Sequence, residues 1–303
     1  MKKIIIGVVV VVIIILGFVF FWGSDEAVVN NNQNNQVTEE KPGDTNTKPD
    51  DAKPADKTKT VLGLSAGGND IVAYHYGEGE KELLFIGGIH GGYAWNSSYL
   101  SYELMDYLKT SSSSIPSDVK VTVIPAMNPD GLKKVTGTAE KFALADVSDV
   151  QSVLTSGRFN DNLVDLNRNF DCDWQENATW QNKKVSGGTA AFSEPEAKAI
   201  KDYVEKNKIT AVVTFDSAVG GVFASNCHNG VSTETNDLVK AYSKASGYKA
   251  YQDFDFYSTT GDMINWFAKN KIPAIGVLLT THTSIEWNNN KAGVEAVLKY
   301  YSK

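Results

Sequence analysis

Apolar segments with strand-like and helix-like spacing alternate from Val61 to the C-terminus, and this alternation constrains the fold more than any other feature. The predicted strands are Ile71–Tyr76, Leu83–Ile86, Val119–Pro125, Ile209–Phe215 and Pro273–Leu279. The predicted helices are Asn96–Leu108, Ala145–Leu154, a segment from a Ser193 cap to about Lys206, Thr235–Ser246, Gly261–Asn270 and Asn290–Tyr301. This order predicts an α/β fold, a three-layer sandwich in which a mixed β-sheet is flanked by helices. Polar motifs at the strand ends then indicate a site at the carboxyl edge of the sheet.

The N-terminal segment predicts a membrane anchor. Ile4–Trp22 is an apolar run without a charge, and at about 1.5 Å per residue a helix of this length approaches the ~30 Å hydrocarbon core. Lys2 and Lys3 precede it, and acidic residues follow it, so we expect the remainder of the chain to lie outside the membrane. Residues 1–23 are therefore interpreted as one transmembrane helix that holds an extracytoplasmic domain at the cell surface or in the periplasm. A cleaved signal peptide, which would leave a secreted protein, is the alternative.

Residues 24–60 have the composition of a linker, since Asn, Gln, Lys, Asp, Thr and Pro dominate and large apolar residues are almost absent. We expect this segment to be a disordered polar spacer. The whole chain carries a net charge of −7 and has no basic block beyond Lys2 and Lys3. Nucleic-acid binding, which needs a clustered basic face, is therefore not expected.

One stretch, V-D-L-N-R-N-F-D (Val164–Asp171), sets the amide of Asn167 beside the guanidinium of Arg168. Arg can hold a carboxylate through two parallel hydrogen bonds, so this pair suits a terminal carboxylate. The stretch belongs to an ordered run of motifs, which are I-H-G-G (Ile89–Gly92), N-P-D-G (Asn128–Gly131), R-F-N (Arg158–Asn160), S-E-P-E (Ser193–Glu196), T-F-D-S (Thr214–Ser217), Tyr257 and V-L-L-T-T-H-T (Val277–Thr283). In order and spacing the run resembles the zinc carboxypeptidases of the carboxypeptidase A type, especially the bacterial members that act on cell-wall peptides and short peptides. The resemblance covers residues 61–303 and implies a carboxypeptidase-like domain there.

The resemblance also implies where the catalytic groups should stand. In such enzymes zinc is held by a His, a nearby Glu and a second His, and a further Glu is the general base. His90 matches the first ligand, whereas the Glu position falls at Tyr93 or Ala94, the second His position at Asp216 and the general-base position at Leu278. Ala and Leu can neither bind a metal nor accept a proton. We therefore expect no intact catalytic residue, a vestigial metal pair of His90 and Asp216, and weak or absent zinc binding.

The substrate-binding positions match the family better. By resemblance Arg158 stabilises an oxyanion, Asn167 and Arg168 clamp the substrate carboxylate, and Tyr257 is the mobile capping residue. Ile264 falls where the family lines its side-chain pocket, which indicates an apolar floor.

Two cysteines, Cys172 and Cys227, follow segments that the resemblance brings together near the site. A disulfide between them would brace the clamp loop in an exported domain, and the alternative is two separate core residues. His228 and His282 are lesser candidates for a metal ligand.

Two functions follow from these residues. In the first, a tethered and hydrolytically inactive domain binds the free carboxylate end of a peptide or of a peptidoglycan stem peptide. In the second, the chain is an active metallocarboxypeptidase with a nonstandard metal site. Deliberate inactivation of an active parent enzyme would also account for the three replacements.

Overall fold

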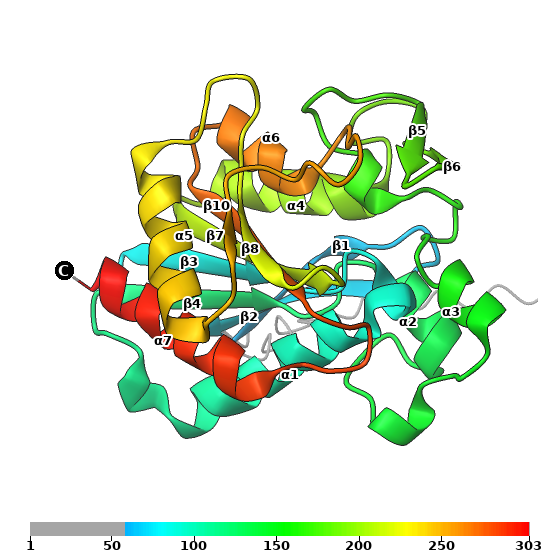
Figure 1. Cartoon of the computed structure of the whole chain (residues 1–303). Helices are drawn as coiled ribbons and strands as arrows, with labels where there is room; N and C mark the ends of the chain where they lie inside the picture. Colours follow the sequence, from blue (N-terminus) through cyan, green and yellow to red (C-terminus); the bar gives the residue numbers. More distant parts are fainter. Residues whose placement is uncertain (1–57, 303) are drawn as a thin grey trace, which may run out of the picture. The chain divides into compact units, whose positions relative to one another are not determined.

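The computed structural model describes residues 58–302 (Figure 1). The expected anchor over Ile4–Trp22 and nearly all of the expected linker lie outside the described residues. Within the described part of the chain, no helix combines the length and the hydropathy needed to cross a membrane.

The structure contains a mixed eight-stranded sheet. Its strands are β1 (Lys59–Leu64), β2 (Asp70–Tyr76), β3 (Lys81–Ile86), β4 (Val119–Ile124), β7 (Ile209–Ser217), β8 (Gly221–Ala224), β9 (Ala250–Tyr251) and β10 (Ala274–Leu279). Their spatial order is β1-β2-β4-β3-β7-β10-β8-β9. The four central strands β4, β3, β7 and β10 run parallel, whereas β1, β2 and β8 pair antiparallel with a neighbour. A separate hairpin pairs β5 (Asn177–Trp180) with β6 (Lys183–Ser186).

Helices cover both faces of this sheet. The α-helices are α1 (Trp95–Thr110), α2 (Pro129–Thr136), α3 (Gln151–Ser156), α4 (Pro195–Lys206), α5 (Thr233–Ser246), α6 (Met263–Lys269) and α7 (Trp287–Tyr301). Figure 1 shows α1, α5 and α7 on one side of the sheet and α4 and α6 on the other.

The two cores explain this layering. Leu83 and Phe85 of β3 belong to a cluster with α1, α5 and α7, whereas Leu84 and Ile86 belong to a cluster with α4 and α6. Successive residues of a strand point to opposite faces, so one apolar run can supply both cores. The predicted α/β fold, with a mixed sheet flanked by helices, is confirmed.

Several boundaries differ from the sequence prediction. The helix expected over Ala145–Leu154 is instead a 3₁₀ turn at Leu144–Asp146 and the short helix α3 from Gln151 to Ser156, and between them the amide of Ser148 donates to the carbonyl of Val135. The N-P-D-G motif begins the helix α2 and is more than a turn, since the Asn128 side chain accepts from the amide of Gly131. Ser193 is not the cap of α4. Its hydroxyl accepts from other groups instead, and Glu194 precedes the helix.

Candidate functional site

The candidate site lies where the central strands β3, β7 and β10 end. β7 and β10 are parallel neighbours, and their register sets Leu278 directly beside Asp216. His90 follows β3 after a turn in which Gly88 has a φ of +71°, a conformation that favours glycine. These three side chains line one pocket together with Tyr93, Arg158, Asn167, Arg168, Trp180, Tyr257, Asp262 and His282. The fold thus gathers motif residues that lie far apart in the sequence.

His90 and Asp216 contact each other directly. His90 Nδ1 lies 3.0 Å from Oδ1 and 2.9 Å from Oδ2 of Asp216, and His90 Nε2 lies 3.5 Å from Oδ1 of Asp165. Burial and the nearby Arg158 oppose protonation, but the two carboxylates raise the pKa of His90 above its ordinary value. The imidazole is therefore held between two acidic partners.

Asp165, which the motif comparison did not single out, joins His90 to Arg158. Its Oδ2 accepts from Arg158 Nε at 2.8 Å and lies 2.8 Å from Nη2, and both side chains are almost completely buried. Burial opposes ionisation, yet Arg158 and His90 hold the pKa of Asp165 well below its usual range. The sequence held one signal for this residue, a carboxylate between the apolar Val164 and Leu166.

The residues present do not fit a catalytic zinc ion, for which three protein ligands are typical. Ala94 is fully buried in the 3₁₀ turn Gly91–Ala94 and has no donor atom, and Leu278 lines the pocket with an aliphatic side chain. Across residues 58–302, no third His, Cys, Asp or Glu joins His90 and Asp216 in a ligand cluster.

His282 belongs to the wall of the pocket. Its ring packs edge-on against Tyr93, with 4.6 Å between centroids, and its Nδ1 lies 2.9 Å from Ser217 Oγ. The Ser217 hydroxyl donates to Asn96 Oδ1 at 3.0 Å. Burial lowers the pKa of His282, so this imidazole is a neutral hydrogen-bonding group.

The two residues of the expected clamp have different bonding. Asn167 Nδ2 donates to Asp262 Oδ2 at 3.0 Å, and Asn167 Oδ1 accepts from the amide of Met263, so this side chain holds the start of α6. Arg168 donates from Nε to the carbonyl of Thr179 and from Nη1 to the carbonyl of Asn167. Its Nη2 is buried and has no hydrogen-bond partner among residues 58–302. Nη2 is therefore the one nitrogen of this guanidinium that the described residues leave unbonded.

Aromatic rings flank the other arginine. Arg158 Cζ lies 4.3 Å from the ring centroid of Trp180 and 5.6 Å from that of Tyr93. Trp180 comes from the β5–β6 hairpin, which the sequence did not predict, and it fixes the guanidinium through its π face. Tyr257 lines the same pocket and packs edge-on against Phe254, and burial raises its pKa.

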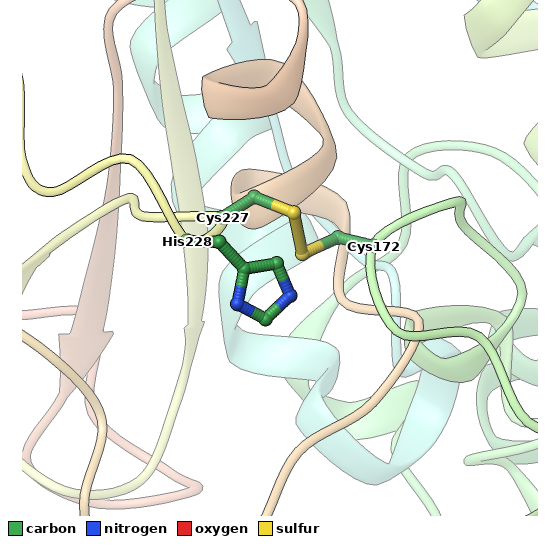
Figure 2. A group of neighbouring side chains, drawn as sticks. All are labelled: Cys172, Cys227 and His228. Atoms are coloured by element: carbon green, nitrogen blue, oxygen red, sulfur yellow. A yellow bond between two sulfur atoms is a disulfide. The ribbon is translucent and has the colours of Figure 1, made fainter.

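The structure joins Cys172 to Cys227 in a disulfide (Figure 2). This bond links the loop after Asn167 and Arg168 covalently to the segment after β8. The amide of Gly261 donates to the carbonyl of Cys172 at 2.7 Å. Gly261 precedes Asp262, the cap of α6, so the disulfide and the pocket share one short loop.

The fold is that of a metallocarboxypeptidase-like domain. The sequence profile of the zinc carboxypeptidase family matches residues 50–301, and the chain belongs to that family. Among solved structures, bovine thrombin-activatable fibrinolysis inhibitor, in complex with a tick carboxypeptidase inhibitor, has a TM-score of 0.62 and 17% identity over 80% of this chain and 88% of its own.

Two bacterial structures have the same fold. Murein-tripeptide amidase from Escherichia coli O157 has a TM-score of 0.54 and 20% identity over 79% of this chain and 90% of its own. A metallo-carboxypeptidase from Burkholderia cenocepacia has a TM-score of 0.56 and 13% identity over 80% and 64%. A search of curated protein sequences finds no match.

Proposed function

We propose that this chain is a membrane-tethered, extracytoplasmic zinc-carboxypeptidase-like domain that binds the free C-terminal carboxylate of a peptide without hydrolysing it. The observation that carries the proposal is the unpaired Nη2 of Arg168 at the pocket. A buried charged donor without a partner is costly, and an incoming carboxylate would satisfy it.

The bonding of Arg168 supports this role. Two backbone carbonyls hold Nε and Nη1, so the guanidinium plane is oriented before any ligand arrives. Such preorganisation lowers the entropy cost of binding. Arg158 lies in the same pocket, where Asp165 and Trp180 fix its guanidinium and the ionised Asp165 offsets its charge.

The proposed loss of hydrolysis rests on the residues that replace the catalytic set. Peptide hydrolysis by this family needs a metal to activate water and a base to accept its proton. Ala94 and Leu278 supply neither function, and within residues 58–302 no third ligand joins His90 and Asp216. The role that we propose for the pocket is therefore binding of a ligand without its hydrolysis.

A peptidoglycan stem peptide is the ligand class that we favour. The similarity of fold to murein-tripeptide amidase supports it, and so does the proposed position outside the membrane, where cell-wall peptides are found. The anchor expected over Ile4–Trp22 and the linker expected over residues 24–60 would keep the pocket near the membrane surface.

Calorimetry with two ligands tests the proposal. The full-length chain is titrated with a stem-type tripeptide that has a free C-terminal carboxylate and with its C-terminal amide. We expect binding of the acid and loss of roughly 10–100-fold in affinity for the amide, since a hydrogen bond to a charged group contributes about 1.5–3 kcal/mol. Equal affinity for both ligands would refute the carboxylate assignment.

Two variants locate the binding group. Arg168→Ala should remove the preference for the acid, and Arg168→Lys should restore it only in part because Lys lacks the planar fork. Lys269→Ala is the matched control, since Lys269 pairs with Asp171 and does not line the pocket. Release of the C-terminal residue by the wild-type chain, with or without added zinc, would show that the domain is an enzyme.

A further inference from the structure

A second cluster of metal-binding side chains lies outside the pocket. Cys172, Cys227 and His228 each place a ligand atom within 4.8 Å of the other two (Figure 2). In the structure the two sulfur atoms form a disulfide, which leaves no thiolate for a metal. The cluster can bind a metal only after that bond is reduced.

A polar residue directly follows each half-cystine, Asp173 after Cys172 and His228 after Cys227. His228 Nε2 lies 2.8 Å from Asp173 Oδ1, so the residues that follow the two cysteines also contact each other. A carboxylate bonded to an imidazole in this way orients the ring in many metal sites.

The backbone at both positions is unusual. Asp173 has a φ of +56° and His228 a φ of +66°, in the left-handed region that few non-glycine residues adopt. With these conformations, Asp173 contacts His228, and a ring nitrogen of His228 lies near the two sulfur atoms. Both side chains are more than half exposed, so an ion can reach them from solvent, whereas the cysteines are buried.

We propose that reduction of the Cys172–Cys227 disulfide converts this corner into a site for a thiophilic divalent cation such as Zn²⁺. The ligands are the two thiolates and Nδ1 of His228, since Asp173 contacts Nε2 and so orients the ring. Thiolate and imidazole donors select Zn²⁺ over Mg²⁺ or Ca²⁺, which prefer oxygen. The proposal does not rest on the proposed function, although the carbonyl of Cys172 also bonds to Gly261 beside the carboxylate pocket.

The chemistry balances with an external thiol reductant. A dithiol gives two electrons and two protons to the disulfide, which breaks the S–S bond, forms two protein thiols and converts the reductant into its own disulfide. When Zn²⁺ binds, the two thiols lose their protons to solvent. Oxidation of the thiolates to the disulfide by an external disulfide reverses the sequence and releases the ion.

Metal uptake by the two redox states tests the proposal. The full-length chain, oxidised or reduced with the excess dithiol removed, is titrated with Zn²⁺ and separately with Co²⁺. We expect uptake of one Zn²⁺ by the reduced chain only, and with Co²⁺ the visible absorption bands of a tetrahedral thiolate site. Reduced, folded protein that takes up no metal would overturn the proposal.

Three variants distinguish this site from any other. His228→Ala removes an exposed side chain and should weaken binding by more than the roughly 10–100-fold that loss of an orienting partner costs. Asp173→Asn should weaken Zn²⁺ binding by roughly 10–100-fold, because it removes only the orienting partner. The variant Cys172→Ser/Cys227→Ser should take up no metal, whether or not it has been treated with the reductant. Metal binding by this variant would place the ion elsewhere and refute the assignment.

Discussion

The imidazole of His90 bonds to the carboxylate of Asp216, with Nδ1 2.9 and 3.0 Å from the two oxygens. The motifs predict both residues to be at metal-ligand positions, and in this structure the two side chains contact each other. The interaction lies in a buried site, where an ion pair that loses one partner leaves an uncompensated charge. The pair therefore links the turn after β3 to the end of β7.

His90→Ala should destabilise the fold by about 3–5 kcal/mol, because it leaves Asp216 without its partner and removes a neighbour of Asp165. The double variant His90→Ala/Asp216→Ala should cost less than the sum of the two single changes. Urea unfolding of the four proteins measures this coupling. Additive costs would mean that the two side chains do not interact.

The variant Ala94→Glu/Asp216→His/Leu278→Glu should regain a zinc site and some peptide hydrolysis, since it restores the family's ligands and general base. Zinc at 100 times its dissociation constant should stabilise this variant by about 2.7 kcal/mol and leave the oxidised wild-type chain unchanged. Thermal unfolding with the disulfide intact is the measurement. A folded variant that zinc does not stabilise would show that the motif positions are wrongly matched.

Cys172→Ser/Cys227→Ser should lower the free energy of unfolding by about 4 kcal/mol, as expected for a loop closed over a separation of 55 residues. Carboxylate affinity should fall as well, because the carbonyl of Cys172 is bonded to Gly261 beside the pocket. Denaturant unfolding and the tripeptide titration test the two effects. Unchanged stability would show that the disulfide contributes little to the fold.

Glu196→Gln should change how stability depends on pH. Burial raises the pKa of Glu196 from 4.5 to about 7, although the carboxylate accepts hydrogen bonds from the amide of Ala66 and from Asn160. Its favourable contribution is complete below about pH 4.5 and is lost as the pH rises toward 7, with a size on the order of 3 kcal/mol.

Glutamine cannot ionise, so the stability of the variant relative to wild type should increase across that window. Urea unfolding at a series of pH values provides the comparison. Parallel stability curves for the two proteins would show that Glu196 titrates normally.

Local pattern predicted the layers of the fold. The alternation within β3 and the helical spacing of Leu100, Leu104 and Leu108 in α1 are local properties, and both segments formed as expected. The strands β1, β8 and β9 and the hairpin β5–β6 were missed, because pairing with neighbouring strands stabilises them more than local preference does. The linker expected over residues 24–60 was wrong at its end, since Lys59 and Thr60 belong to β1.

The sequence by itself determined which residues could not do zinc chemistry, because Ala94 and Leu278 lack the necessary atoms in any conformation. The tertiary structure alone decided the partners of the others. It paired His90 with Asp216 and bonded the Asn167 side chain to the first amide of α6. It also left Nη2 of Arg168 without a partner among the described residues. Those outcomes depend on contacts between segments far apart in the chain, and on which polar groups burial removes from water, neither of which local sequence encodes.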